Sequence, residues 1–155
     1  MIRPFRAGDA LALGAIYSAS RRVAMPWLDC PHTPAEEARY LATVAFPPAQ
    51  VWVAEHEGAP AGFLAREGEW IMQLYLHPEL RRQGFGTALL AAARADQPPL
   101  LRLYAFQRNT AARAFYEGHG FRLVALTDGA DNMEREPDAL YEWRNPDFPT
   151  HPETP

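Results

Sequence analysis

A short stretch near the middle of the chain has the residue types of an anion-binding turn. It runs from Arg81 to Thr87 with the sequence Arg-Arg-Gln-Gly-Phe-Gly-Thr, after a strand-like segment and before a helix-like one. A helix N-terminus presents unpaired N–H groups and a partial positive charge, and glycine lets a phosphate approach the backbone closely. The two arginines add positive potential. The stretch therefore predicts a turn that binds a diphosphate.

Two other phosphate-binding loops do not fit this stretch. A P-loop requires a lysine before its Ser or Thr, whereas here Gly86 precedes Thr87 and the chain contains no lysine. A dinucleotide fingerprint requires a third glycine or an alanine where this chain has Leu89. One alternative stays open, in which the glycines only allow tight packing where a strand meets a helix.

A second candidate lies on a helix that Asn109 is expected to cap and Gly120 to end. Asn109 and Tyr116 are seven residues apart, close to two helical turns, so they share one face, and the small Ala112 leaves that face open. A tyrosine with a pKa of about 10 stays protonated at neutral pH and can donate its proton to a departing thiolate. The alternative is that Tyr116 is an ordinary core aromatic residue.

The elements that must position these residues alternate between strands and helices. Proline and glycine mark the breaks, and the run from Thr33 to Glu36 has the capping signature of a helix start. We also expect Asp9 to be the N-cap of the first helix. The order of elements predicts an α/β fold, a mixed sheet with helices on both faces. We expect strands at residues 2–6, 51–57, 61–66, 70–77, 100–106, 121–127 and 139–144, and helices at 10–24, 34–46, 84–95 and 110–120.

The composition excludes several classes of protein. A net charge of −4 gives no basic footprint for nucleic acid, and no apolar run is long enough to span a membrane. The N-terminus has no signal-peptide core, and the lone Cys30 cannot form an internal disulfide. We therefore expect a cytoplasmic protein without nucleic-acid or membrane partners. Residues 1–145 should form a single domain, and residues 146–155 a Pro-rich tail outside its core.

Taken together, the two motifs resemble those of the GNAT superfamily of N-acetyltransferases. The segment at residues 103–109, followed by residues 127–129, 136–138 and 141–143, also resembles one bacterial subgroup of that superfamily. The first family signature, [Gln/Arg]-x-x-Gly-x-[Gly/Ala] after a strand, matches residues 81–86. The second, Asn-x-x-Ala-x-x-x-Tyr-x-x-x-Gly-Phe, matches residues 109–121. Residues 74–78 are similar to the family's fourth strand and its exit. The resemblance implies the GNAT fold, in which a mostly antiparallel sheet splays apart between strands 4 and 5.

The resemblance also implies that acetyl-CoA is the co-substrate, with no metal. The backbone of Leu74 and Leu76 and the side chain of Asn109 would contact the pantetheine arm. N–H groups of residues 82–87 would hold the pyrophosphate, and Tyr116 would protonate the coenzyme A thiolate. The implied cofactor-binding residues are Leu74, Tyr75, Leu76, Arg81, Arg82, Gln83, Gly84, Phe85, Gly86, Thr87, Asn109, Ala112 and Tyr116.

The residue that deprotonates the amine is not fixed by the resemblance. Tyr104 stands where some relatives carry Glu, and Gln73 cannot act as a base. Three routes for the proton stay open: Glu69, a water chain to bulk solvent, and His32, because histidine as a residue type can take up a proton near neutral pH. The alternative role for His32 is packing or capping beside the following helix. We expect the acceptor to contact Trp27, His32, Trp70 and Tyr104, with the acidic loop at residues 128–138 attracting a cationic amine.

The resemblance implies transfer of an acetyl group from acetyl-CoA to a primary amine, by direct attack in a ternary complex. The acceptor we expect is a small molecule. Two alternatives stay open: acetylation of a protein N-terminus or lysine, and a non-catalytic module that binds acyl-CoA. Homodimerisation through the last strands is common in such folds, and the sequence does not fix the oligomeric state.

Overall fold

In the computed structural model, which describes residues 1–148, a seven-stranded sheet has the order β1-β2-β3-β4-β5-β7-β6. Neighbouring strands are antiparallel except β4 and β5, which are parallel. The mixed, mostly antiparallel sheet expected from the sequence is confirmed. Residues 149–155, most of the expected Pro-rich tail, lie outside the described residues. The strands are β1 (Ile2–Pro4), β2 (Gln50–His56), β3 (Ala59–Glu67), β4 (Trp70–Leu76), β5 (Leu100–Phe106), β6 (Arg122–Leu126) and β7 (Asp138–Arg144).

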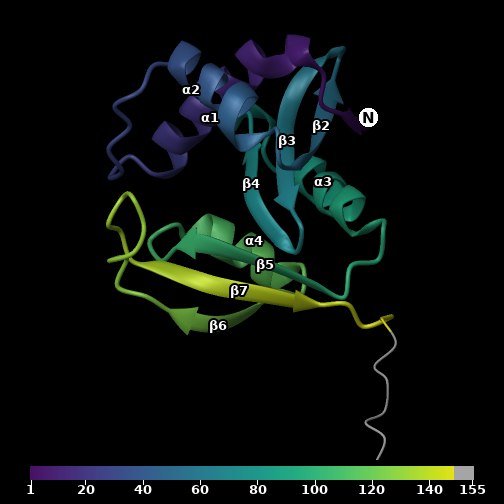
Figure 1. Ribbon diagram of the computed structural model, residues 1–155, viewed down its shortest axis with the longest axis vertical. Helices are drawn as coiled ribbons and strands as arrows, with labels where there is room; N and C mark the ends of the chain where they lie inside the picture. The colour runs from purple at the N-terminus through teal and green to yellow at the C-terminus, as the bar shows by residue number, and fades with distance from the viewer. Residues whose placement is uncertain (149–155) are drawn as a thin grey trace, which may run out of the picture.

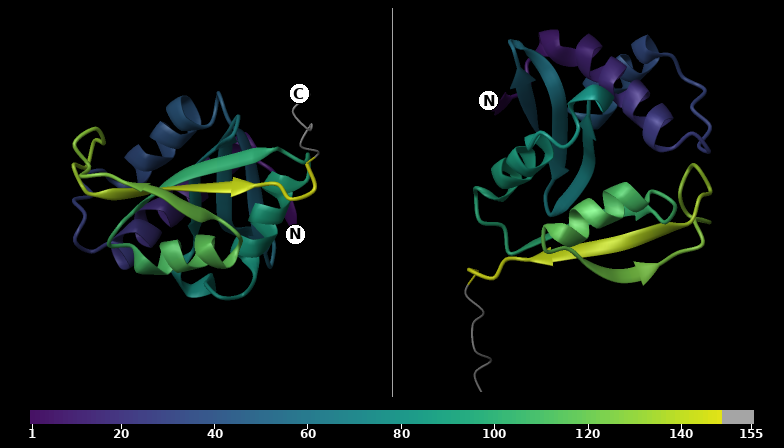
Figure 2. Two further views of the ribbon diagram at one scale, coloured as in Figure 1. Left: turned by 90° about the horizontal axis from the view of Figure 1, so that it is seen from below. Right: turned by 180° about the vertical axis from the view of Figure 1, so that it is seen from behind.

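Helices cover both faces of this sheet, as expected. The helices α1 (Ala10–Ala24) and α2 (Pro34–Tyr40) lie over β2, β3 and β4 on one face (Figure 1). The helices α3 (Phe85–Arg94) and α4 (Thr110–Gly118) lie on the opposite face, and both are in front in the view from behind (Figure 2). Two buried clusters of apolar side chains follow this division, one on each face. Within residues 1–148, no helix combines the length and the apolar character needed to cross a membrane.

Two helices end differently from the expectation. The helix expected at residues 34–46 is α-helical only to Tyr40 and continues as a π-helical turn, η2 (Leu41–Ala45). In that turn the N–H of Phe46 bonds the carbonyl oxygen of Leu41 at 2.9 Å, a spacing of five residues. Helix α4 ends at Gly118, and Gly120 follows with a positive φ of 88°. Short 3₁₀ turns, η1 (Ala7–Asp9) and η3 (Pro78–Leu80), precede α1 and follow β4.

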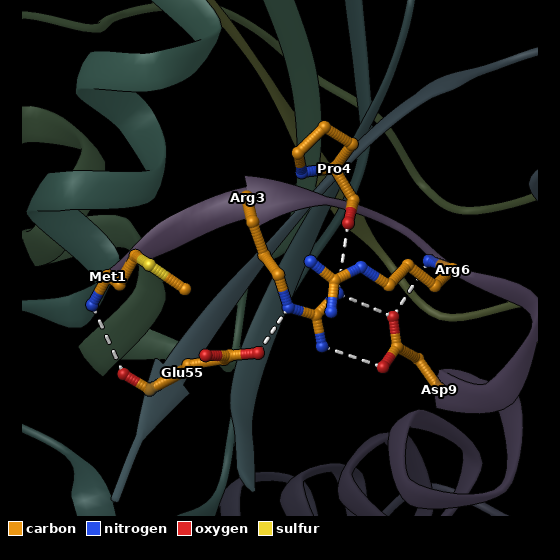
Figure 3. A network of polar contacts seen from close by, with 6 residues as sticks. All are labelled: Met1, Arg3, Pro4, Arg6, Asp9 and Glu55. Carbon is orange, nitrogen blue, oxygen red and sulfur yellow. Dashed lines mark hydrogen bonds and ion pairs between the residues drawn. The ribbon is translucent and has the colours of Figure 1, made fainter. Parts of the chain in front are cut away.

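A buried charged network anchors β1 (Figure 3). Asp9 occupies the expected N-cap position of α1 but makes no side-chain cap bond there. Its carboxylate instead accepts from Arg3 Nη2 at 2.7 Å and from the backbone N–H of Arg6 at 2.8 Å. Arg3 also pairs with Glu55 of β2. The Arg3 guanidinium is the main cause that holds the pKa of the Asp9 carboxyl below its ordinary value. The network thus ties β1 and η1 to β2.

Candidate active site

Strands β4 and β5 are joined at one end only. Their single paired position within the described residues is Trp70 with Arg102, and beyond it the strands diverge (Figure 1). Strand β4 also carries one extra residue, Met72, opposite the step from Ala65 to Arg66 in β3. A bulge bends its strand and increases the local twist. It lies where β4 leaves β5, and the expected splay between strands 4 and 5 is confirmed.

The main chain of β4 offers hydrogen-bonding groups to the gap between these strands. The N–H of His77 bonds the carbonyl oxygen of Ala61 in β3 at 2.7 Å. Successive strand residues point their main-chain groups to alternate sides. The groups of Tyr75 therefore face β3, whereas those of Leu74 and Leu76 face the gap. An extended ligand can add to this open edge as a further strand would.

A cavity of about 430 Å³ lies in the gap. It is lined by β4, β5, α4 and the loop between β6 and β7, and its volume is in the range of small-molecule sites. The fold thus brings the helix motif to the splayed strands, whereas residues 81–87 are not part of the lining. The predicted site residues that line this cavity are Leu74, Tyr75, Tyr104, Asn109, Ala112 and Tyr116.

Helix α4 presents two polar side chains to this cavity. Tyr116 is 8% exposed, and its burial, with Tyr75 as a second cause, raises the pKa of its hydroxyl above the ordinary value. The hydroxyl is therefore protonated at neutral pH and can act as a proton donor. The side-chain oxygen of Asn109 accepts the N–H of Ala112 at 3.2 Å, as the N-cap of α4. This leaves the NH₂ group of Asn109 as the group that can bind a ligand.

The N-terminus of α3 is open to an anion. Gly84 precedes the helix with a φ of 88°, in the left-handed region that favours glycine, and a Cβ built there would meet no atom within 4 Å. The N–H of Ala88 bonds the carbonyl oxygen of Gly84 at 3.0 Å, and the N–H groups of residues 85–87 precede this helical ladder. These groups and the partial positive charge of the helix end can bind a phosphate.

Some of residues 81–87, at this helix end, contact other elements, and others are exposed. Arg81 reaches the carbonyl oxygen of Ser20 in α1 at 3.5 Å. Gly86 is buried, and a Cβ there would lie 3.1 Å from the ring of Phe115. A glycine at this position therefore favours close packing of α3 on α4. Arg82, Gln83 and Thr87 are exposed, and Phe85 is half-buried.

The aromatic residues expected to contact the acceptor lie on the face of β5 that α4 does not cover, which we call the acceptor face. Trp70 and Tyr104 stack with ring centroids 5.5 Å apart and planes 9° from parallel, beside the paired end of β4 and β5. Trp27 packs edge-on against Phe106 at 5.9 Å, and the guanidinium of Arg108 lies 4.2 Å from its ring. The structure therefore brings Tyr104 to the cavity and leaves Trp27 and Trp70 beside it.

The structure does not bring His32 or Glu69 to the cavity that Tyr116 lines. His32 lies on a second cavity of about 710 Å³, formed by α1, α2 and the loop between them, and its side chain is 62% exposed. Its Nδ1 is 3.9 Å from the carboxylate of Glu36. Glu69 lies in the turn between β3 and β4, with its carboxylate 3.8 Å from Nε of Arg102. Proton transfer from an amine in the gap to either residue would need intervening water.

Several polar residues of the cavity were not singled out as site residues from the sequence, among them Gln73 and Glu134. Gln73 lines it from β4, and its Oε1 is buried without a hydrogen-bond partner in residues 1–148. Glu134, in the loop between β6 and β7, lines both this cavity and the second one. The acidic composition of residues 128–138 was the only signal for Glu134. Composition does not select one of the five carboxylates in that segment, because the path of the loop decides which one turns inward.

A family model described as an acetyltransferase (GNAT) domain matches residues 47–123. That segment contains β4, the glycine turn, α3, β5 and α4, the elements that form the gap and its cavity. The match agrees with the splayed sheet and with both motifs. The chain belongs to the GNAT superfamily of N-acetyltransferases, as its motifs predicted, and acetyl-CoA is the co-substrate of that family.

Individual relatives agree with this assignment. The peptidyl-lysine N-acetyltransferase YiaC of Escherichia coli is 34% identical over 99 residues, which cover 63% of this chain and 62% of that protein. The match therefore spans less than two thirds of the relative's length. The solution structure of apo YjaB from Escherichia coli has a TM-score of 0.76 at 26% identity, covering 92% of this chain and 96% of that one. The structure of yncA from Salmonella typhimurium with acetyl-CoA has a TM-score of 0.70 at 17% identity, covering 99% and 98%, and shows the common fold.

Proposed function

We propose that the protein transfers an acetyl group from acetyl-CoA to a primary amine, by direct attack in a ternary complex. The observation that carries this proposal is the cavity in the gap between β4 and β5. It has a buried proton donor, Tyr116, on the α4 side and carboxylates of the β6–β7 loop at its other wall. Transfer requires a thioester and an amine to meet in a fixed geometry, and a cavity with access for both supports this.

Acetyl-CoA would lie along β4 with its pyrophosphate at the N-terminus of α3. The main-chain groups of Leu74 and Leu76 that face the gap would pair with the amides of the pantetheine arm, and the NH₂ group of Asn109 would add a further bond. The N–H groups of residues 82–87 would bind the pyrophosphate. The thioester would then reach the gap beside Tyr116.

The transfer step uses water together with the chain's own groups. The ammonium first gives a proton to water that leads out of the gap. The amine nitrogen then attacks the carbonyl carbon, the C–S bond breaks, and Tyr116 gives its proton to the departing thiolate. The new amide nitrogen loses its second proton to the same water, through which Tyr116 regains one. A main-chain N–H of β4 that faces the gap polarises the carbonyl oxygen while negative charge develops on it. This route forms no acyl-enzyme, and Cys30 lies on the second cavity instead of the gap.

The acceptor we propose is a small-molecule primary amine that arrives as a cation. None of the described residues that line the cavity is Arg, Lys or His, so the charged groups on its lining are all carboxylates. A wall of negative charges raises the local concentration of a cationic substrate. The four carboxylates belong to Asp128, Asp131, Glu134 and Asp138.

A second candidate acceptor is the side chain of a lysine in a peptide. It is favoured by the names of two relatives, since YiaC and the Salmonella typhimurium protein YjaB, 31% identical over 96 residues, are both called peptidyl-lysine N-acetyltransferases. The second cavity, of about 710 Å³, adjoins the first at Glu134 and has room for residues that flank a lysine.

Thiol release from acetyl-CoA separates these candidates when three sets of acceptors are compared. The sets are free amines and diamines, peptides with an internal lysine and a blocked N-terminus, and lysine-free peptides with a free N-terminus. Release with the first set supports the small-molecule acceptor, and release with the second or third set supports a protein acceptor. Binding of acetyl-CoA without release in any set would instead indicate a non-catalytic module and overturn the proposal.

A further inference from the structure

We propose that Glu134 and the side-chain oxygen of Gln73 form the binding site for the ammonium group of the acceptor. This inference rests on the proposed function and adds the residues that select the charge of the acceptor. It differs from the search for a general base, because both residues are assigned to binding the amine before it loses its proton.

Glu134 lies where the two cavities adjoin. The loop that carries it, between β6 and β7, comes next to the loop between α1 and α2 (Figures 1 and 2). Its side chain lines the cavity in the gap and also the second cavity, and it is 30% exposed. An acceptor whose body occupies the second cavity would therefore pass this carboxylate on its way to the thioester.

Arg21 of α1 holds the Glu134 carboxylate in this position. Its Nη2 lies 3.6 Å from Oε1 of Glu134, and its own side chain is 13% exposed. Arg21 is itself fixed by Tyr17, whose hydroxyl accepts from Nη1 and whose ring centroid lies 4.9 Å from the guanidinium. Because 3.6 Å exceeds a hydrogen-bond distance, the contact orients Glu134 without occupying its oxygens. Both oxygens can still accept N–H groups from a ligand.

Gln73 provides a second acceptor on the same face of the sheet. Gln73 lines the cavity, and its Oε1 is buried and lacks a partner in residues 1–148. A buried polar atom without a partner costs free energy, which a donor on a bound ligand would recover. Gln73 is two residues from Tyr75, whose ring packs on Tyr17 of α1 at 4.8 Å, so Gln73 faces the side on which Arg21 and Glu134 lie.

An ammonium group matches this pair of acceptors. It carries three N–H donors, and Glu134 and Gln73 would accept two of them. The third proton is the one lost before the nitrogen attacks. Because an ion pair with Glu134 stabilises the charged amine, its removal should raise the KM for the acceptor without lowering kcat in proportion. Removal of a general base would instead lower kcat.

Calorimetry on the coenzyme A complex tests this site without requiring turnover. The enzyme is saturated with coenzyme A and titrated with putrescine and with N-α-acetyl-lysine amide; N-α-acetyl-norleucine amide is the neutral control. We expect Glu134→Gln to bind both cations about tenfold more weakly, the loss of one charge-assisted hydrogen bond. Asp131→Asn removes an equal charge from the same loop and cavity, and it should weaken binding less than about threefold. Both variants should keep the wild-type Tm and affinity for coenzyme A.

Three results would overturn the inference. The first is that the wild-type protein binds neither cation. The second is that Glu134→Gln and Asp131→Asn lose the same affinity for the cations. The third is that the wild type binds the lysine and norleucine amides with equal affinity. Thiol release by the wild type is measured separately. If the wild type releases no thiol but the cations bind as described, the proposed transfer is wrong and the ammonium site stands.

Discussion

Tyr116 lies on α4 between the apolar core and the cavity in the gap. The aromatic ring packs with Phe121 and Phe115, at centroid distances of 5.5 Å and 5.3 Å, and its hydroxyl belongs to a residue that lines the cavity. Both alternatives raised by the sequence therefore apply to the same side chain: the ring is a core residue and the hydroxyl is a candidate acid. Burial keeps that hydroxyl protonated, which is the form that can donate to a thiolate.

Replacing Tyr116 with Phe should separate these two roles. Phe retains the ring and its packing, so the affinity for acetyl-CoA should change little, whereas kcat should fall about 100-fold because the thiolate leaves unprotonated. Steady-state thiol release and calorimetry measure the two quantities. Tyr104→Phe is the matched control, since Tyr104 also lines the cavity but is 54% exposed on the acceptor face. Equal kcat for Tyr116→Phe and wild type would show that Tyr116 is not the acid.

The sequence predicts the residues of the gap unequally. Asn109 and Tyr116 follow from helical spacing, because local geometry alone puts them on one face. His32 and Glu69 were chosen by residue type and expected position, and neither lines the cavity. Glu134 was not predicted as a site residue, because its position depends on contact with Arg21, which is far away in the sequence. Local sequence patterns do not predict such long-range contacts.

The turn before α3 is the element that should bind the pyrophosphate. Gly84→Glu would introduce a carboxylate where the phosphates are expected, and its φ of 88° adds strain of about 1–2 kcal/mol for any side chain. We expect the affinity for acetyl-CoA to fall at least about 100-fold, measured by calorimetry.

Gly58→Glu is the matched control for this change. Gly58 also has a positive φ, of 78°, with no atom within 4 Å of an added Cβ, but it lies in the turn between β2 and β3. It should share the loss of stability and keep the affinity for acetyl-CoA. If Gly84→Glu binds acetyl-CoA as tightly as Gly58→Glu does, the pyrophosphate site lies elsewhere.

The charged network around Asp9 should make the docking of β1 depend on pH. In Asp9→Ala the buried Arg3 guanidinium keeps only Glu55 as a carboxylate partner. The free energy of unfolding should therefore fall by about 3 kcal/mol at pH 7. The pKa of Asp9 is lowered in the folded state, so its contribution is complete above the unfolded pKa and is lost as the pH falls through the folded one.

Urea unfolding at pH 7 and at acid pH measures this dependence. The difference between wild type and Asp9→Ala should narrow as the pH falls below about 4. A difference that stays constant over this range would show that the carboxylate of Asp9 does not provide the stabilisation.

Helices α1 and α2, which both line the second cavity, touch at Gly14. A Cβ on Gly14 would lie 2.5 Å from Cβ of Ala38 and 2.6 Å from its Cα and N. Gly14→Ala gains about 1 kcal/mol of helix propensity. The clash should outweigh that gain, because backbone atoms cannot rotate away, and we expect a net loss of about 1–2 kcal/mol in thermal unfolding. Adding Ala38→Gly should recover less than the full loss, and an unchanged Tm in Gly14→Ala would contradict this packing.

At the scale of the whole molecule, the order of strands and helices was predictable because hydrophobic periodicity and Pro and Gly breaks are local signals. The positions at which the elements end were less predictable from the sequence. No periodicity and no Pro or Gly break indicates the π-helical turn at Leu41–Ala45. The splay came from the family resemblance alone. Its structural basis, the bulge at Met72 and the single β4–β5 pair, depends on register, which a strand pattern does not encode. The two parts of the sheet that result are plain in Figure 1.

A titration of the ¹⁵N-labelled protein with acetyl-CoA, followed by amide chemical shifts, locates the binding site of the acetyl donor directly. A chain of 155 residues is small enough for this. We predict saturable shifts along one path, from the N–H groups of residues 82–87, through Leu74 and Leu76, to Asn109 and Tyr116, with little change in β1 and η1. Saturable binding with shifts elsewhere, or no binding, would contradict the claim that the gap between β4 and β5 holds the acetyl donor.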